Sequence, residues 1–490
     1  MTILSGLLWT PALGALLLVL VPGHKAETIR HIGHGFTGIA FALACVLLSQ
    51  FDAQDATLQF NEFYPLNPKL GSAYALGVDG LSMPLLLLAT LLCGVTSFAS
   101  SSISDSLKGY YIAVLLLEFG MLGVFLAQDW ALFYIFWEVT LIPLYFLIDR
   151  WGGQRRHAAS LNFVLYTMGG SVFMLLSLLA ISEYDLESQG SLMVSMGQVA
   201  QNMPLFEQIL VLLGFLIGFG VKMPIFPLHG WLPLAHVEAP SPISILLSGI
   251  LLKMGAYGLL RTFVMLPVAA QALQPVLVFL ALFGMIYGGL LAWRQRDLKA
   301  MIAYSSLSHM GLVLLGMATL NHTGFTGAML QMTAHGLIAG ALFLLIGLLY
   351  ERTHTRNVED YSSLVSVMPR FAAFTTLALL AAMGLPGSVG FIAELHALMG
   401  GFQQWGWLMV FCSVSILISA AYAMRTLGLL FTGPVKPRMQ TIADLRPLEM
   451  MSAGVLVGSI VVFGLLPAPW IELSTATIDR MLLVIGERLP

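Results

Sequence analysis

The chain has 490 residues, of which 58% are hydrophobic and only 10% are charged. An ordinary soluble domain carries roughly a quarter charged residues, so this composition indicates an integral membrane protein. The net charge is −3 and no long run of like charge occurs, which excludes nucleic acid as a partner. The three cysteines, Cys45, Cys93 and Cys412, stand alone in apolar segments. The sequence therefore lacks the paired Cys or Cys and His residues that a disulfide, zinc or iron–sulfur site needs.

Fourteen segments are long and apolar enough to cross a membrane, which takes about 20 mainly apolar residues. In chain order they cover residues 3–21, 33–50, 81–99, 110–128, 130–148, 160–182, 207–228, 242–263, 273–292, 300–319, 325–349, 370–395, 405–428 and 446–468. We therefore expect an all-α polytopic membrane protein with about 14 transmembrane helices. The polar segments 51–79 and 183–206 are expected as outer loops, and residues 469–490 as a short amphipathic tail.

Lysine and arginine are distributed unevenly over the expected loops. Loops after odd-numbered helices hold 15 of the 22 Lys and Arg residues, and four lie on the other side. These four are Lys69, Arg261, Arg480 and Arg488, while Lys222, Lys253 and Arg425 lie inside helices. Because cytoplasmic loops carry the excess of these residues, we expect both termini on the periplasmic or lumenal side.

Two of the expected helices contain breaks. Pro224 and Pro227 interrupt the seventh helix, and Pro386 with Gly387 interrupts the twelfth. Broken helices are tolerated at membrane depth where they line a cavity or are buried in protein. Because the breaks are five helices apart, we expect two inverted five-helix repeats. The chain then divides into residues 1–109 with helices 1–3, 110–263 with helices 4–8, 264–430 with helices 9–13, and 431–490 with helix 14 and the tail.

Ionisable residues inside the expected helices are few. Each costs roughly 2.5–3.5 kcal/mol to insert, so such residues are functional candidates by default. They are Glu118, Glu138, Lys222, Lys253, Glu394 and Arg425, with His309 and His335 as titratable neighbours. We expect Glu118 either to have a function or to make a packing hydrogen bond. Arg425 is expected to reach the membrane interface or to pair with a carboxylate.

Glu138 and Lys222 are expected on neighbouring helices. A carboxylate and an ammonium group 4 Å apart attract each other by about 4 kcal/mol at an effective dielectric near 20. A lysine with a movable partner can load and release a proton, and the alternative is a static pair that only fixes helix packing.

Lys253, His309, His335 and Glu394 follow on the central helices. Histidine titrates near neutrality, which suits a proton relay, although a single histidine can equally be a packing residue. The row of four favours proton transfer. The sequence has no Cys/His metal cluster, no Ser–His–Asp arrangement and no phosphate loop. It thus offers proton-carrying groups but no electron-carrying ones, and we expect partner proteins to drive it.

Four stretches resemble the antiporter-like membrane subunits of respiratory complex I. They are FYIFWEVTLIPLYFLI, GVKMPIFPLHGWLPLAHVEAPSPISILLSGILLKMGAYGLLR, RDLKAMIAYSSLSHMG and GLPGSVGFIAE, between about residue 75 and about residue 430. Within that family, a glutamate on helix 12 distinguishes the subunit M or chain 4 type (NuoM, NdhD), so Glu394 indicates this type. The opening region YPLNPKLGSAYALGVDGLSMPLLLL and the loop FDAQDATLQFNEF look closest to the cyanobacterial NdhD proteins.

The resemblance implies proton transfer by six residues. It gives a switchable pair of Glu138 and Lys222, a central carrier Lys253, a hydrated axis with His309 and His335, and a terminal site at Glu394. It further implies that this chain binds no cofactor, since iron–sulfur clusters, flavin and quinone belong to partner subunits. The implied partners are other membrane-arm subunits, including sibling antiporter-like subunits, together with lipids and protons.

The function that the resemblance implies is outward proton translocation within a complex I-like NAD(P)H or ferredoxin:quinone oxidoreductase. The membrane would be a bacterial plasma membrane or a cyanobacterial or plastid thylakoid membrane, and the machine includes variants for cyclic electron flow or CO2 uptake. An Mrp-type Na+/H+ antiporter subunit is the alternative, and a purely structural subunit is the third. One loop departs from the family: it usually resembles HTWLPDAH, whereas residues 229–236 read HGWLPLAH. The change removes a carboxylate near the channel mouth, so the sequence does not define the route by which protons are taken up.

Overall fold

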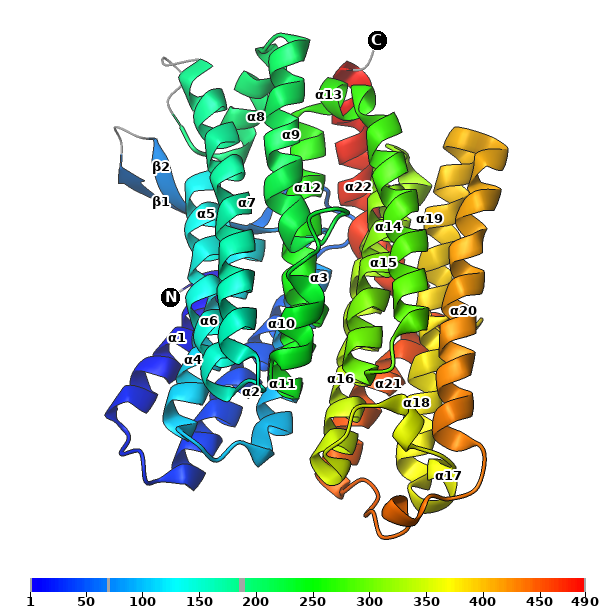
Figure 1. Ribbon diagram of the computed structural model, residues 1–490. Coiled ribbons are helices and arrows are strands. Elements are labelled where there is room, and N and C mark those ends of the chain that lie inside the picture. Colours follow the sequence, from blue (N-terminus) through cyan, green and yellow to red (C-terminus); the bar gives the residue numbers. More distant parts are fainter. Residues whose placement is uncertain (1, 68–70, 185–189, 489–490) are drawn as a thin grey trace.

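The computed structural model describes residues 2–67, 71–184 and 190–488, and these residues form a bundle of long helices with one β-hairpin (Figure 1). Among them, 13 helical runs are long and apolar enough to cross a membrane. All fourteen expected segments coincide with helices. The two counts differ because α18 is too short by itself, and because α19 and α20 count as one run, Val389–Phe431. The expected fold class is confirmed.

The elements of the first half are α1 Ile3–Leu20, α2 Ala26–Gln50, β1 Gln59–Asn67, β2 Ser72–Val78, α3 Ser82–Ala99, α4 Leu107–Leu126, α5 Trp130–Val139, α6 Leu141–Trp151, α7 Arg156–Tyr184, α8 Met193–Asn202, α9 Leu205–Lys222, α10 Leu232–Glu238, α11 Ser241–Leu246 and α12 Leu252–Met265. The second half consists of α13 Pro267–Ala272, α14 Gln274–Arg294, α15 Leu298–Ala318, α16 His322–Thr353, α17 Leu364–Val367, α18 Pro369–Ala382, α19 Val389–Trp405, α20 Met409–Phe431, α21 Pro447–Leu465 and α22 Ala468–Arg488.

The loops rich in Lys and Arg lie together at one end of the bundle. Figure 1 shows the connection from α1 to α2 and the segment around α17 at the bottom, whereas α8, α13 and the C-terminus lie at the top. The end that carries α8 and the C-terminus is called the outer end below, following the charge asymmetry of the loops. Lys69, one of the four outer basic residues, lies outside the described residues.

Both predicted helix breaks are present. The seventh helix ends as α9 at Lys222 and resumes as α10 only at Leu232. The break deprives the carbonyl oxygen of Val221 of a helical partner, and the indole N–H of Trp231 donates to it at 2.7 Å instead. The twelfth helix is divided into α18 and α19, and Gly384 in the gap has a φ of +75°, which only glycine adopts at low cost.

A third irregularity was not predicted. Residues Leu247–Leu251, between α11 and α12, form a π-helical turn inside the eighth helix, two residues before Lys253. Such turns remove one regular carbonyl acceptor from the helical pattern and are frequent at functional sites. This turn therefore has a direct bearing on how Lys253 is held.

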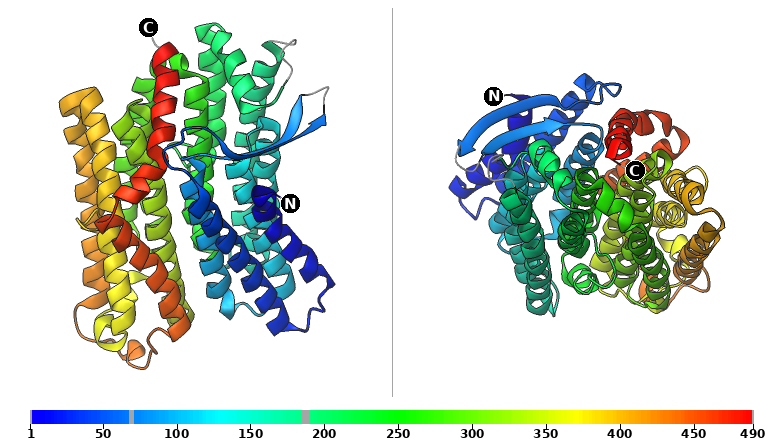
Figure 2. Two further views of the ribbon diagram at one scale, coloured as in Figure 1. Left: turned by 180° about the vertical axis from the view of Figure 1, so that it is seen from behind. Right: turned by 90° about the horizontal axis from the view of Figure 1, so that it is seen from above.

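The polar outer segments, expected as loops, contain regular secondary structure. β1 and β2 pair antiparallel into a hairpin that runs across the outer part of the bundle (Figure 2). Its Glu62 accepts hydrogen bonds from the backbone N–H groups of Leu4 and Ser5 at 3.0 Å and so caps α1. The expected amphipathic tail is the helix α22, whose buried residues are Ser474, Thr477, Ile478, Met481 and Ile485.

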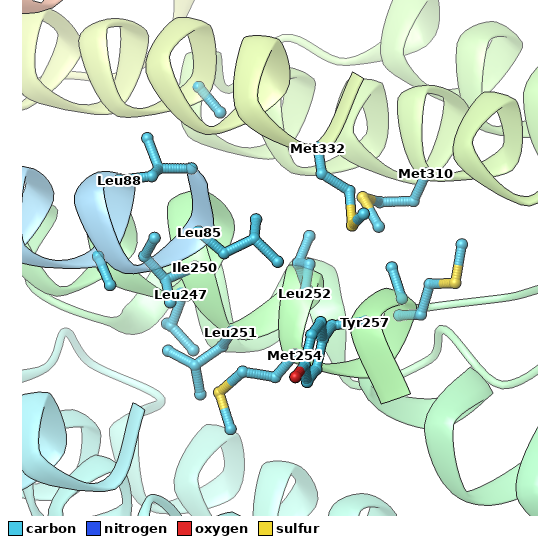
Figure 3. Packing of buried hydrophobic residues seen from close by; sticks show 14 of the residues in the cluster. Leu85, Leu88, Leu247, Ile250, Leu251, Leu252, Met254, Tyr257, Met310 and Met332 are labelled. Atoms are coloured by element: carbon cyan, nitrogen blue, oxygen red, sulfur yellow. The ribbon is translucent and has the colours of Figure 1, made fainter. Parts of the chain in front are cut away.

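Burial separates central helices from peripheral ones. The most apolar window is fully buried in the run Ser241–Met265 and in α16, and 94% buried in α15, against 28% in α2 and 33% in α21. Leu85 and Leu88 of α3 face Leu247, Ile250 and Leu251 of the eighth helix in Figure 3. The helices that carry Lys253, His309 and His335 are thus the ones shielded from lipid by the rest of the chain.

Candidate functional site

Lys222 occupies the last residue of α9, where the negative end of the helix dipole favours a cation. Its ammonium group donates to Oγ1 of Thr140 at 3.0 Å and lies 3.9 Å from the ring centroid of Trp137. Among the described residues, no ion pair joins Lys222 to Glu138, although the two charges interact electrostatically. The predicted pair is therefore open in this structure, because Thr140 and Trp137 supply the partners of the lysine.

The two carboxyl groups of this region are poorly satisfied. Within the part of the chain that the structure describes, Oε1 of Glu138 and both carboxyl oxygens of Glu118 are buried without a hydrogen-bond partner. Glu118 is completely buried on α4. No described residue makes the packing hydrogen bond that was one expectation for Glu118. Burying a carboxyl group without a partner costs free energy, so packing alone does not explain this residue.

Lys253 is completely buried on α12 and is held from two sides. Its ammonium group donates to the carbonyl oxygen of Ser248 at 2.6 Å. Ser248 lies in the π-helical turn five residues earlier, so the turn supplies the acceptor. The same group donates to Nδ1 of His335 at 2.6 Å. Since an ammonium group only donates, Nδ1 accepts and the ring proton of His335 is on Nε2, which has no partner among the described residues.

His335, His309 and Glu394 continue the row away from Lys253. The two imidazole rings have their centroids 5.5 Å apart. Nδ1 of His309 lies 3.8 Å from Oε1 of Glu394 and 3.2 Å from Nε2 of Gln331. Four ionisable side chains from α12, α16, α15 and α19 thus follow one another through the buried interior. Gln331 was not predicted as part of this row.

A small cavity lies next to the end of this row. It has a volume of about 10 Å³ and its wall includes His309, Glu394 and the hydroxyl groups of Ser308, Ser415 and Ser419. This volume is about that needed for one water molecule, and the polar wall offers several hydrogen-bond partners. The carboxyl group of Glu394 therefore has room for a water between α14, α15, α19 and α20.

The helices that carry the two lysines are in close contact. A Cβ atom added to Gly255 of α12 would lie 2.7 Å from the carbonyl oxygen of Phe219 and 2.8 Å from the amide nitrogen of Met223. Both atoms flank Lys222 at the end of α9. Only glycine allows this approach, so Lys222 and Lys253 belong to helices that touch backbone to backbone.

Several polar residues near the site were not predicted. Thr140 and Gln331 are side chains of ordinary type on buried helices, and nothing in their sequence spacing distinguishes them. His236 is completely buried and stacks on Phe343 with ring centroids 4.9 Å apart. In the described part of the chain neither of its ring nitrogens has a hydrogen-bond partner. The motif around residues 229–236 could have drawn attention to it.

Two further cations, Lys299 and Arg425, bind backbone carbonyls. Lys299 was counted as a loop residue, but it is buried and donates to the carbonyl oxygen of Ala239 at 2.6 Å. Arg425 donates to the carbonyl oxygens of Trp293 at 2.8 Å and of Gln295 at 3.2 Å. Of the two expectations for Arg425, the interface or a carboxylate partner, the second is not met among the described residues, because the C-terminal end of α14 offers free carbonyls instead.

Comparison with known proteins identifies the family. The family described as "NADH:quinone oxidoreductase/Mrp antiporter, TM" matches residues 127–419, which is more than half of the chain and includes all six predicted site residues. This chain belongs to that antiporter family. It is 39% identical to NAD(P)H-quinone oxidoreductase chain 4 1 of Picosynechococcus sp. over 98% of this chain and 91% of the relative. It is 39% identical to NAD(P)H-quinone oxidoreductase chain 4 2 of Thermosynechococcus vestitus over 96% of this chain and 89% of the relative.

Solved structures of the antiporter family agree. A chain of respiratory complex I from Thermus thermophilus has a TM-score of 0.90 and 30% identity, covering 99% of this chain and 100% of that one. A chain of the Mrp complex from Dietzia sp. has a TM-score of 0.86 at 19% identity, with 100% of both chains covered, which shows the fold alone. The chain is therefore a multi-pass membrane protein, and the predicted resemblance to the subunit M or chain 4 type is confirmed.

Proposed function

We propose that this chain translocates protons outward across the membrane as one subunit of a complex I-like quinone oxidoreductase. The observation that supports it most directly is the buried row Lys253, His335, His309 and Glu394, with contacts of 2.6 Å at one end and 3.8 Å at the other. Relatives named as NAD(P)H-quinone oxidoreductase chain 4 point to the same kind of machine.

The row has the chemistry that proton movement requires. Each member can exist with and without a proton. Lys253 is hydrogen-bonded to His335, the two imidazole rings have centroids 5.5 Å apart, and His309 lies 3.8 Å from Glu394. A proton on Lys253 can pass to His335, which frees the lysine for the next one. Glu394, beside a cavity that fits one water, is the terminal acceptor of this route.

Lys222 provides the switch in this proposal. When it is bound to Thr140 its charge is held by a neutral acceptor, and Glu138 remains an alternative partner. Moving the ammonium group from Thr140 to Glu138 changes the field at Lys253 and therefore the ease with which Lys253 takes a proton. Residues 110–263 and 264–430 would then act as the two halves of one proton channel.

Electron transfer belongs to other subunits in this proposal. Iron–sulfur clusters, flavin and quinone are assigned to partner proteins, and this chain contributes protonatable groups. Its neighbours would be other membrane-arm subunits, including sibling antiporter-like chains, in a plasma or thylakoid membrane. The relatives are cyanobacterial, which favours the thylakoid assignment and an NAD(P)H or ferredoxin donor.

The test uses the assembled complex in proteoliposomes with and without the variant Lys253→Ala. Loss of the central carrier should remove this chain's share of the protons translocated per electron, so that only the share of the sibling chains remains. The variant His335→Gln serves where Lys253→Ala does not assemble, and Lys25→Ala, on the surface, is the matched control. Unchanged translocation in assembled Lys253→Ala and His335→Gln complexes would leave only a structural role. Robust Na+/H+ exchange by the purified chain would favour the Mrp-type function instead.

A further inference from the structure

A second polar cluster lies at the outer end, apart from the row described above. A cavity of about 370 Å³ is enclosed by α8, α12, α22 and the segment before α3. Exposed side chains such as Gln198, Arg480 and Arg488 line its opening, while Asp79 and Arg261 form its inner wall. This cavity, called the outer cavity, brings the outer solution to the far end of α12.

The inner wall is a strong ion pair. The guanidinium group of Arg261 reaches both carboxylate oxygens of Asp79, at 2.8 Å to Oδ1 and 2.7 Å to Oδ2. Such a bidentate pair is geometrically fixed. Asp79 also accepts from the backbone N–H groups of Leu81 and Ser82 at 3.1 Å, so it is anchored to the start of α3. The side chains are only 15% and 5% exposed, so the pair closes the cavity toward the interior.

Tyr257 lies behind this pair. Arg261 donates to its hydroxyl group at 3.0 Å, and the hydroxyl donates weakly to the carbonyl oxygen of Phe125 at 3.4 Å. The tyrosine is completely buried and does not line the outer cavity. It is thus the next polar group inward from Arg261.

Lys253, Tyr257 and Arg261 are four residues apart along α12, so they lie on one face of the helix. At 1.5 Å per residue, Arg261 is about 12 Å further out than Lys253. This face is therefore the short direct path between the mid-membrane lysine and the outer solution. The path through His335, His309 and Glu394 instead runs across three further helices, α16, α15 and α19.

We propose that Asp79, Arg261 and Tyr257 form an outer seal that prevents protons from exchanging directly between Lys253 and the outer cavity. The inference rests on the proposed function, since only a proton carrier needs such protection. The bidentate pair offers an incoming proton no free acceptor, because Arg261 occupies both carboxylate oxygens of Asp79. Asp79 and Tyr257 make three polar contacts with the two terminal nitrogens, which leaves fewer N–H groups to bind water. A proton on Lys253 is then left with the route through His335.

The helix α22 also holds the seal in place, through its contact with the residue next to Asp79. The backbone N–H of Gly80, next to Asp79, donates to Oγ1 of Thr477 at 2.9 Å. A Cβ atom at position 80 would lie 2.9 Å from Cα of Ser474 and from Oγ1 of Thr477. The amphipathic tail therefore presses directly on the segment that carries Asp79. Thr477 lines the outer cavity as well, so one helix both shapes the cavity and fixes its inner wall.

The test measures passive proton leak in the absence of any electron donor. The assembled complex, with Arg261→Gln or Tyr257→Phe in this chain, is placed in liposomes, a pH gradient is imposed, and its decay is followed with an internal dye. Arg261→Gln frees the carboxylate of Asp79 to take up a proton and water, so the leak should rise by about tenfold, the factor for a change of one unit charge at a helix rise of about 12 Å and an effective dielectric of about 20. Tyr257→Phe should raise it in the same direction.

Arg425→Gln is the matched control, because this arginine is also carried by a membrane helix but binds only carbonyl oxygens near the end of α14. Its leak should equal that of the unaltered complex. An unchanged leak in Tyr257→Phe, which keeps the ring and the fold, overturns the seal even if Arg261→Gln fails to assemble. Since no turnover occurs in this assay, a negative result is independent of whether the complex translocates protons when an electron donor is supplied.

Discussion

Lys253 and His335 are 82 residues apart in the chain, and their side chains share one hydrogen bond of 2.6 Å between Nζ and Nδ1. A direct bond between two titratable groups allows a proton to pass without an intervening water. The π-helical turn before Lys253 supports this bond, because the carbonyl oxygen of Ser248 in the turn accepts a second hydrogen bond from the ammonium group. The site is therefore set by an irregularity of the backbone as much as by the residues themselves.

His335→Gln tests the first step of the row. Glutamine can accept a hydrogen bond from Lys253 but cannot carry a proton, so the protons translocated per electron should fall by the share that this chain carries. The assay is dye-detected acidification in proteoliposomes during turnover. His354→Gln, at the exposed residue directly after the same helix, should behave like the unaltered chain. Full translocation by an assembled His335→Gln complex would remove His335 from the route.

Thr140→Val tests the open state of Lys222. The variant keeps the shape of the side chain but leaves the buried ammonium group without its acceptor, which should cost about 1–3 kcal/mol of stability. The loss should appear as a lower unfolding temperature of the purified complex. Thr432→Val is the control, since that exposed hydroxyl bonds only to the carbonyl oxygen of Gly428. Equal unfolding temperatures for the two variants would contradict the assigned contact.

Gly384→Ala tests the break between α18 and α19. Alanine at a φ of +75° is strained by about 1–2 kcal/mol, and its Cβ atom would collide with the carboxyl group of Glu394. We expect both lower stability and impaired proton translocation, because the carboxyl group has to move. Gly428→Ala, whose added methyl group meets open space, should leave both unchanged. An active and stable Gly384→Ala complex would show that Glu394 tolerates displacement.

The Asp79–Arg261 pair makes stability depend on pH. Burial by itself raises the pKa of Asp79, but the Arg261 guanidinium and the backbone donors outweigh it and hold that pKa below its ordinary value of 3.8. A lowered pKa means that the stabilisation is complete above about pH 4 and is lost as the pH falls through the lower value. At about pH 7 the unfolding temperature of Asp79→Asn should thus lie below that of the unaltered chain. The difference between the two unfolding temperatures should shrink below about pH 4. A difference that is constant with pH would mean that the charge of Asp79 is not what matters.

Sequence reasoning identified the helices and both breaks, because hydropathy and proline act locally along the chain. Pro224 and Pro386 marked the gaps where α9 and α18 end. The sequence also predicted the members of the row Lys253, His309, His335 and Glu394, because ionisable residues are easily recognised in apolar helices of a chain with few charges. The structure adds how closely Lys253, His335 and the others lie.

The partners of these residues could not be predicted in the same way. That Lys222 binds Thr140 depends on how α5 and α9 are rotated against each other, and that information is not contained in either segment alone. The hairpin β1–β2 was missed because its exposed positions, such as Phe63 and Leu66, do not alternate as in a half-buried strand. The π-helical turn at Leu247–Leu251 has no sequence signature comparable to proline.

The contact at Gly255 also limits how the subunit can respond to its partners. Because α9 and α12 meet backbone to backbone there, the two helices cannot slide past each other without breaking that contact. In the function proposed above, the movable part at Lys222 would then be its own side chain, which has four rotatable bonds and would change partner from Thr140 to Glu138. A charged side chain of this kind would respond to a change in the local electric field and not to a movement of helices. A charge that appears in a neighbouring subunit could set it in motion while every helix stays where it is.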